Sequence, residues 1–413
     1  MNIALPQHAP SGAARQESLR EHNLRLVLGC VAEAQSAGNE EFSRANIAAQ
    51  TGLTRGAVSD LVDRLINAGL LEQGEPASRA SSGRPAVPLF IAERSLAALG
   101  VEINVSALSV CALDLRGEVL AQQSRPGDYR RSNPKLVLAQ VAELAAKVCA
   151  ELDPTIPVIG AAVAVPGLVD DRTGPLRIAP NLGWQDLDLR AELQNYPALA
   201  NLPLIVGNEA DYAARAEQIV RPQTSEFIYV SGEVGIGATA VLDSQVWVGR
   251  RGWAGELGHM VVDPAGPACT CGAVGCLEQF AGRDAIYRAA GLPLDSDFST
   301  LLDLVERKDE AALRAVKSAA GRLGQALAGY VNLVDVSLVV LGGMFAPLSE
   351  HLIPIISEQL ALQVLWAPWQ QVTVARAATW PQAAMHGAAH QVLGEVFANP
   401  TKYLELDAAD RNY

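Results

Sequence analysis

Hydrophobic positions in the first part of the chain recur at the spacing of a helix that buries one face. Two sets of apolar residues stand at positions i, i+3, i+4 and i+7: Leu24, Val27, Leu28 and Val31, and then Val58, Leu61, Val62 and Leu65. Residues at this spacing lie on one side of an α-helix. The pattern therefore predicts two amphipathic helices that pack together in a small core.

Capping and turn residues divide the segment around the second set into two helices. Ser43 and Thr54 are residue types that cap helix N-termini, and Gly52 stands between them as a turn residue. A helix, a short turn and a second helix form a helix-turn-helix, whose second helix offers its N-terminal residues to the DNA major groove. We expect DNA contacts from this unit by Arg44, Thr54, Arg55 and Ser59.

Residues 70–93 continue this unit as a predicted wing, with a strand, a tip rich in Ser, Gly and Arg, and a returning strand. The tip carries Arg79 and Arg84, which we expect to contact DNA, and no acidic residue lies between positions 76 and 90. Residues 1–93 contain eight Arg against ten Asp plus Glu, about −2 in all, so attraction to phosphates must be concentrated at the wing and near Arg44 and Arg55. A winged helix can also act as a protein-interaction module, and that alternative stays open.

The pattern of elements predicts three parts of the chain. Residues 1–16 are rich in Pro, Gly and Ala and are expected to form a disordered tail, followed by the winged helix-turn-helix domain at 17–93. From 94 to 413 strands and helices alternate, and the nearly continuous apolar run at 158–170 is typical of a central strand covered on both faces. We expect two α/β halves with a ligand cleft at the carboxyl ends of their strands.

Composition narrows the location and the partners. The 413 residues are 49% hydrophobic, but no uncharged apolar run approaches the ~18 residues of a membrane helix. The N-terminus also lacks the apolar core of a secretory signal, so a cytoplasmic protein is the expectation. A net charge of −13 argues against nonspecific binding of polyanions, although a small head can still be locally basic and bind DNA.

Three of the six cysteines lie within eight residues, at Cys269, Cys271 and Cys276, and His259 precedes them by ten residues. In a reducing compartment such clustered thiols are more typical of metal ligands than of disulfides. Three thiolates and one imidazole complete a tetrahedral structural zinc site with no open position. The segment 256–278 is thus a predicted zinc loop, with free cysteines or a redox switch as alternatives.

Several motifs together carry a family resemblance: AVPGLVD, PNLGW, NEADYAARAE, GELGHM, CTCGAVGCLE and VVLGGMF. With the winged head they resemble the transcriptional-regulator branch of the ROK family (repressors, open reading frames and sugar kinases) over about residues 20–395. The resemblance implies that residues 94–413 form a two-lobed α/β body of the actin-like, ribonuclease H-like ATPase type. It also implies sugar-binding roles for Gly167, Asn181, Asn208, Glu209, Glu256, His259 and Glu278. The alternatives are solvated loop charges at Glu256 and Glu278 and a turn-capping role for Asn181.

The same resemblance raises the question of sugar phosphorylation. Family kinases place an Asp-x-Gly-x-Thr loop against ATP phosphates, and the matching residues here are Glu102, Asn104 and Ser106. Asn104 adds a side chain where glycine lets the backbone come close, and Glu209 replaces the catalytic Asp with a side chain one methylene longer. The second glycine-rich turn keeps Gly235 and Gly237 but lacks a third family glycine. We therefore expect a sensor derived from a kinase and no enzyme.

The resemblance implies a transcriptional regulator, a repressor of carbohydrate metabolism or transport genes. The expected partners are operator DNA, a sugar or sugar-phosphate effector and further copies of the chain in a dimer or tetramer. One structural zinc ion per chain is the expected cofactor. Two other functions stay open: an active sugar kinase with a DNA-binding head, and a dimeric DNA-binding protein whose body binds no ligand.

Overall fold

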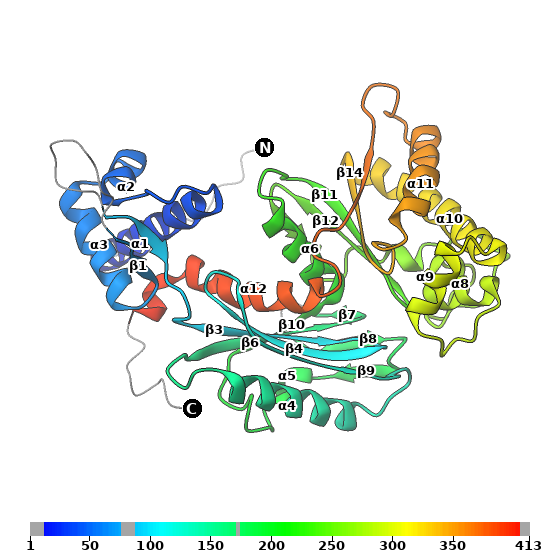
Figure 1. The fold of residues 1–413 in the computed structure, drawn as a ribbon, viewed down its shortest axis with the longest axis horizontal. Helices are drawn as coiled ribbons and strands as arrows, with labels where there is room; N and C mark the ends of the chain where they lie inside the picture. The colour runs from blue at the N-terminus through cyan, green and yellow to red at the C-terminus, as the bar shows by residue number, and fades with distance from the viewer. Residues whose placement is uncertain (1–11, 76–86, 171–173, 405–413) are drawn as a thin grey trace.

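The computed structural model describes residues 12–75, 87–170 and 174–404 (Figure 1). A small N-terminal head sits at one end of a body with two lobes, each built around a five-stranded sheet. Arg79 and Arg84, at the predicted tip of the wing, lie outside the described residues. Within the described ranges, no helix is both long enough and apolar enough to cross a membrane.

The head contains three helices and a two-stranded sheet: α1 (Gly12–Ser36), α2 (Arg44–Thr51), α3 (Arg55–Asn67), β1 (Leu71–Gln73) and β2 (Leu89–Ile91). Helix α1 begins at Gly12, so residues 12–16 are helical and not part of a disordered tail as expected. The reason is local: Ala13, Ala14, Arg15 and Gln16 are helix-favouring residues, and a helix extends at little cost once later turns are fixed.

The two apolar faces predicted from the sequence form the core of the head, because Leu24, Val27, Leu28, Val31, Val58, Leu61, Val62 and Leu65 are all buried. Helix α2 begins after Ser43, whose amide and hydroxyl both donate to Asn46 Oδ1, at 3.0 and 2.6 Å. Helix α3 begins after Thr54, whose hydroxyl oxygen accepts from the amide of Ala57 at 3.2 Å. Strands β1 and β2 pair antiparallel after α3, which confirms the winged helix-turn-helix fold.

The first lobe carries a sheet in the order β10-β6-β3-β4-β5. Its elements are β3 (Ala97–Ile103), β4 (Ala107–Asp114), β5 (Val119–Pro126), α4 (Pro134–Glu151), β6 (Val158–Val165), α5 (Leu189–Leu193) and β10 (Leu204–Asn208). Strands β3, β4 and β5 run antiparallel, whereas β6 and β10 are parallel to β3. A separate small sheet contains β7 (Leu168–Val169), β8 (Leu176–Ala179) and β9 (Trp184–Leu187).

The second lobe repeats this strand arrangement in the order β13-β12-β11-β14-β15. Its strands are β11 (Phe227–Gly232), β12 (Ile236–Leu242), β13 (Gln245–Trp247), β14 (Leu338–Gly343) and β15 (Thr373–Arg376). Its helices are α7 (Glu278–Ala281), α8 (Arg283–Ala290), α9 (Phe298–Glu306), α10 (Glu310–Val334) and α11 (Ser349–Gln363), with the 3₁₀ turn η1 (Leu257–His259) before them. Two lobes with one topology confirm the actin-like body.

Two helices join these parts. Helix α6 (Glu209–Val220) contacts β11 and β12 of the second lobe, and α12 (Ala383–Ala398) packs against α6 and the first sheet (Figure 1). Helix α12 and the following turn η2 (Pro400–Tyr403) also contact α1 of the head. The apolar side chains of the head, α6 and α12 belong to one continuous core, so the head is packed onto the helix that runs between the lobes.

Arg116 ties the head to the first lobe by polar contacts. It stands in the hairpin between β4 and β5, and its Nε donates to the carbonyl oxygen of Ile91 at 2.7 Å. Its other guanidinium nitrogens approach carboxylate oxygens of Glu72 at 2.6 Å and Glu93 at 3.4 Å. Arg116 therefore holds β1, β2 and the segment after them against the body.

Candidate functional site

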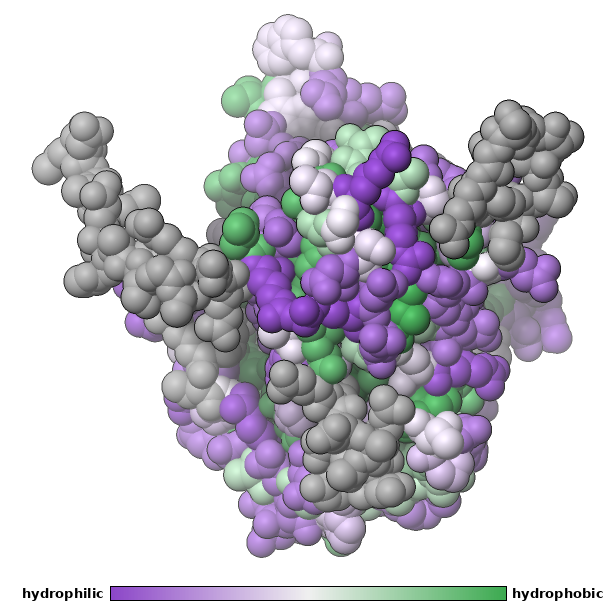
Figure 2. All heavy atoms as spheres, turned by 90° about the vertical axis from the view of Figure 1, so that its left-hand side faces the viewer, coloured by the Kyte–Doolittle hydropathy of each residue, from purple (hydrophilic) through white to green (hydrophobic). Residues whose placement is uncertain are grey.

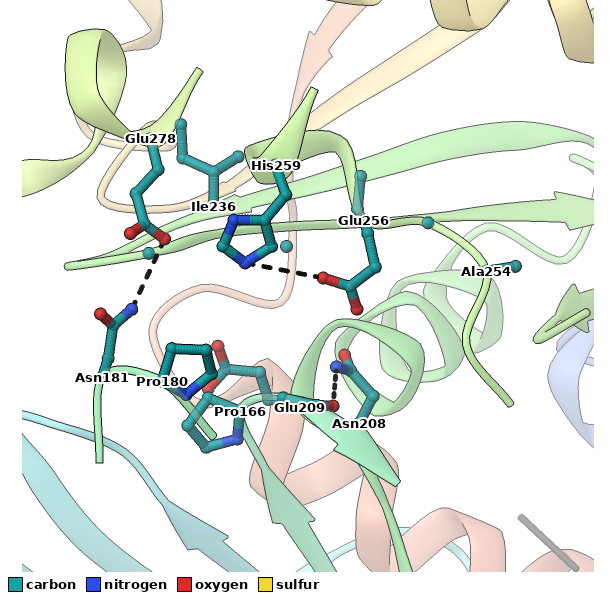
Figure 3. Close-up of a pocket in the computed structure, with 15 residues that line it drawn as sticks. Pro166, Pro180, Asn181, Asn208, Glu209, Ile236, Ala254, Glu256, His259 and Glu278 are labelled. Atoms are coloured by element: carbon teal, nitrogen blue, oxygen red, sulfur yellow. Dashed lines mark hydrogen bonds and ion pairs between the residues drawn. The ribbon is translucent and has the colours of Figure 1, made fainter. Parts of the chain in front are cut away.

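A pocket between the two lobes, here called the interlobe pocket, collects the residues that the resemblance assigned to sugar binding (Figure 3). Gly167, Asn181, Asn208 and Glu209 line it from the first lobe and from α6, and Glu256, His259 and Glu278 line it from the second lobe. In sequence these residues extend over more than a hundred positions. The fold brings all seven to one cavity.

The first-lobe wall is set by the carboxyl ends of β6 and β10, where ligands bind in folds of this type. Gly167 follows β6 with φ +111, and a Cβ atom there would lie 2.1 Å from the carbonyl oxygen of Ile178, so only glycine fits. Asn208 ends β10 and caps α6: its Oδ1 accepts from the amide of Ala210 at 2.7 Å, and its Nδ2 donates to the carbonyl oxygen of Gly167 at 2.9 Å. Asn208 thus fixes the shape of this wall.

A polar contact crosses the pocket between the lobes. Asn181 Nδ2 lies 3.5 Å from Glu278 Oε2, and the two residues come from different lobes (Figure 3). Asn181 therefore does more than cap a turn, because its side chain faces the opposite lobe. A ligand that replaced this long hydrogen bond with shorter bonds to each partner would favour one degree of lobe closure over another.

The carboxyl groups around the interlobe pocket have raised pKa values. Burial raises the pKa of Glu256 and of Glu278 to about 7 in each case. The pKa of Glu209 lies well above its usual value, because of burial first and then the carboxylates of Glu102, Glu233 and Glu256. Near neutral pH such groups both accept and donate hydrogen bonds, as hydroxyl groups require, whereas in their ionised form they repel anions.

The predicted metal ligands lie together behind this pocket. The nearest ligand atoms of His259, Cys269, Cys271 and Cys276 all lie within 4.8 Å of one another. His259 Nδ1 is 3.8 Å from Cys269 Sγ, and the sulfurs of Cys271 and Cys276 are 3.7 Å apart. Metal–sulfur bonds of about 2.3 Å in a tetrahedral site place two sulfurs about 3.8 Å apart, so the four side chains fit a zinc-sized ion.

The imidazole of His259 connects the group of four predicted metal ligands to the interlobe pocket. Its Nδ1 faces the thiols, whereas its Nε2 lies 3.9 Å from Glu256 Oε2 in the pocket (Figure 3). The loop around it is held by turns and two isolated β-bridges. Gly275 has φ +76, and a Cβ atom there would lie 1.6 Å from the carbonyl oxygen of Asp263. A metal bound by Nδ1 would orient Nε2 toward a ligand.

A second cavity, here called the phosphate-side cavity, lies on the other side of Glu209. Glu102, Asn104, Glu209 and Glu233 line it together with Gly343. Asn104 Oδ1 accepts from the amide and the hydroxyl of Ser106 at 3.3 Å each, and its Nδ2 lies 3.5 Å from Glu209 Oε2. The position that the family pattern reserves for glycine is therefore filled by a side chain.

Burial raises the pKa of Glu102 and of Glu233 to about 7, and each adds negative charge at higher pH. Phosphates in this cavity would thus face three carboxyl groups. Glu233 was not among the residues predicted from the sequence, although it stands in the turn of 233–237 that lacks a family glycine. An acidic residue in a glycine-rich turn was the signal that could have identified it.

The residues predicted to contact DNA differ in whether their side chains are exposed or already bound by another residue of the head. Thr54 and Arg55 are exposed at the N-terminus of α3 with Ser59 half-buried one turn later, and Arg55 forms no ion pair with any residue the structure describes. Arg44 instead pairs with Asp63 of α3 at 2.5 Å, so its guanidinium holds α2 against α3. Figure 2 views the molecule from the head end and shows a mainly hydrophilic surface with small separate apolar spots.

Comparison with known proteins points to one family. The sequence profile of the ROK family matches residues 98–395. The xylose repressor of Caldicellulosiruptor bescii is 25% identical over 402 residues, which are 92% of this chain and 98% of the relative. The DNA-binding transcriptional dual regulator NagC of Escherichia coli is 26% identical over 339 residues, 79% and 82% of the two chains. A solved ROK family transcriptional regulator, a homolog of the E. coli MLC protein, superposes with a TM-score of 0.75 at 25% identity, over 94% of this chain and 99% of that chain.

Proposed function

Because this chain belongs to the ROK family, we propose that it is a sugar-responsive, DNA-binding transcriptional repressor acting in the cytoplasm on genes of carbohydrate metabolism or transport. The observation that carries the proposal is the interlobe pocket, where seven residues of the family pattern meet beside the metal cluster. Relatives that align over most of this chain are named a xylose repressor and a DNA-binding transcriptional dual regulator, which supports a regulatory role for this chain.

The effector is a sugar whose hydroxyl groups bind Glu256, His259 and Glu278 on one wall and Glu209 on the other. Carboxyl groups accept paired hydroxyl hydrogen bonds, and the Nε2 of His259 supplies a further polar contact. Several carboxyl groups around one small pocket disfavour an added phosphate, because ionised carboxylates repel it. Of the two effector classes that the sequence left open, we therefore favour the uncharged sugar over the sugar phosphate.

Zinc is the metal that the Cys₃His donor set favours. When bound, it closes the four side chains into a tetrahedral structural site without an open position. The protein then uses the site in two ways: it fixes the loop of 256–278, and it holds the His259 ring so that Nε2 faces the sugar. The ligands are His259, Cys269, Cys271 and Cys276.

DNA is recognised by the head. Arg55 is suited to bidentate contact with guanine, Thr54 and Ser59 reach the groove edge or phosphates, and Arg79 and Arg84 of the wing contact the minor groove or backbone. Arg44 contributes mainly by fixing α2 on α3, since Asp63 holds its guanidinium. Two heads of a dimer would read two half-sites, because one head has few basic residues for phosphate contacts.

Helix α12 transmits the structural effect of sugar binding to the head. The sugar contacts both lobes and so stabilises one degree of closure, and α12 packs on α6 and on the first sheet while its C-terminal end touches α1. A change in closure would therefore alter the placement of the heads relative to operator half-sites. The sugar can change DNA affinity at most by the ratio of its own affinities for the two states of closure.

Kinase activity is disfavoured by the phosphate-side cavity, where Glu233 and the side chain of Asn104 stand where ATP phosphates would bind in the family's kinases. A coupled assay for ADP release with a sugar panel tests this point. Sustained ADP release that depends on one sugar would replace the repressor proposal with the kinase alternative.

The proposed function is tested in two steps with the full chain. A thermal-shift panel of neutral sugars identifies the effector; no shift with any sugar would support the alternative of a body that binds no ligand. Selection of bound fragments from genomic DNA then gives the operator. We expect Arg55→Ala to abolish operator retention, whereas Arg64→Ala, at the other end of α3 and paired with Asp60, retains it. Equal retention by both variants would contradict the proposed docking of α3.

A further inference from the structure

A third cavity of about 290 Å³ lies beside α6 and is separate from the interlobe pocket. The two share Asn208 and no other lining residue. Five branched apolar side chains form its walls: Val169, Ile205, Val206, Val246 and Val248. We call it the side cavity. Its size is at the lower end of the range of small-molecule sites, and its walls are mostly apolar as in such sites.

The polar group that distinguishes the side cavity is Arg215 of α6. It is half-buried and lines the cavity, yet it forms no hydrogen bond or ion pair with any residue that the structure describes. Burial lowers the pKa of its guanidinium, but an arginine side chain keeps its charge at neutral pH. A charged group in apolar surroundings without a partner is costly unless an anion compensates it.

Asp211, one helical turn earlier, is the one carboxyl group among the lining residues. Burial, its largest influence, raises its pKa to about 7, although Thr239 and Arg215 act in the opposite direction. No ion pair joins the two side chains among the described contacts. Asp211 therefore neutralises Arg215 only in part, and in its protonated form it can donate a hydrogen bond to an anion.

We propose that the side cavity is a second ligand site, which binds a small monocarboxylate with an apolar body. The guanidinium of Arg215 binds the carboxylate, and the branched side chains of the walls enclose the apolar body. A sugar fits less well, because the five branched apolar side chains of the walls offer no hydrogen bonds to its hydroxyl groups. The proposal does not rest on sugar sensing, since the two cavities have separate polar side chains apart from Asn208.

The site is tested by isothermal titration calorimetry of the full chain at neutral pH. The probes are hexanoate, phenylacetate and 3-indolepropionate, each compared with its uncharged amide. We expect at least one carboxylate to bind with one-to-one stoichiometry and about tenfold or more tightly than its amide, as a charge-assisted hydrogen bond predicts. If no carboxylate binds more tightly than its amide, the proposal is wrong.

Variants locate the binding. Arg215→Gln should weaken the successful carboxylate about tenfold or more, whereas Arg314→Gln, an exposed arginine on α10, should leave it unchanged. Val248→Trp places a larger side chain in the side cavity, leaves the charge of Arg215 unchanged and should also abolish binding. Asp211→Asn should bind the carboxylate as well as the unmodified chain or better. Unchanged binding in both Arg215→Gln and Val248→Trp would place the carboxylate elsewhere and overturn the proposal.

Discussion

The interlobe pocket and the phosphate-side cavity lie on two sides of Glu209 and differ in the groups that line them. On the pocket side, Glu256, His259 and Glu278 present the hydrogen-bonding groups that a sugar needs. On the phosphate side, the carboxyl group of Glu233 and the side chain of Asn104 line the cavity in which, under the proposed function, a nucleotide would fit poorly. Both sides are rich in buried carboxyl groups, but the partner decides the consequence: hydroxyl groups are bound by them, and phosphates are repelled.

The largest effect on this comparison is expected from loss of a metal ligand. Cys276→Ser removes a buried thiol from the cluster, so we expect the bound metal to be lost and sugar affinity to fall by about 100-fold or more as the His259 ring is released. Elemental analysis and calorimetry measure the two quantities. Cys149→Ser, which changes a thiol remote from the cluster on α4, is the control. Full sugar affinity in metal-free protein would show that sugar binding in the interlobe pocket does not depend on the metal.

A matched pair of carboxyl variants tests the difference between the two sides directly. Glu278→Gln alters a group of the interlobe pocket, and we expect sugar affinity to fall about 10- to 100-fold, the value of one hydrogen bond to a charged group. Glu233→Gln makes the same change on the phosphate side and should leave sugar affinity within about twofold. Calorimetric titration with the effector sugar decides between them. Equal losses would mean that the sugar occupies both cavities.

The pH dependence of stability tests the burial of the phosphate-side carboxyl groups. Glu102 and Glu233 have an ordinary pKa of 4.5 that burial raises to about 7 in the folded protein. Between these values the folded state holds more protons than the unfolded state, so stability falls as pH rises through this window. We expect the thermal midpoint to decrease from about pH 5 to 8, and the double variant Glu102→Gln, Glu233→Gln to show a shallower decrease. An unchanged slope in the variant would show that both groups are solvated.

The smallest effect is expected from an attempt to open the phosphate-side cavity to a nucleotide. The double variant Asn104→Gly, Glu233→Gly removes one blocking side chain and one carboxylate, so weak binding of Mg-ATP, with a dissociation constant on the order of millimolar, should appear in the presence of the sugar. Equilibrium dialysis with labelled ATP measures it. Tight ATP binding by the unmodified chain would show that these residues do not exclude nucleotide.

The sequence predicted what is local along the chain. The spacing of Leu24, Val27, Leu28 and Val31 was enough to identify a buried helix face, because one helix fixes their positions. The four predicted metal ligands could also be identified from the sequence, since they lie within eighteen residues of one loop. The pocket residues depended on the family resemblance, because no local pattern joins Gly167 to Glu278.

Contacts that depend on how the parts pack were not predicted. The approach of Asn181 to Glu278 and the anchoring of the head by Arg116 both join distant segments, and neither leaves a periodic signal. Arg44 was expected at DNA because of its charge and position, but the ion pair with Asp63 depends on the crossing of two helices. Burial likewise decides the protonation of Glu233, and composition alone does not give burial.

The most direct test of the account measures the affinity of the full chain for its operator by fluorescence anisotropy, with and without a saturating amount of the effector sugar. The account predicts that the sugar weakens operator binding about tenfold or more, and that Glu278→Gln binds the operator normally but no longer responds to the same sugar concentration. A sugar that binds the interlobe pocket and leaves operator affinity unchanged would contradict it.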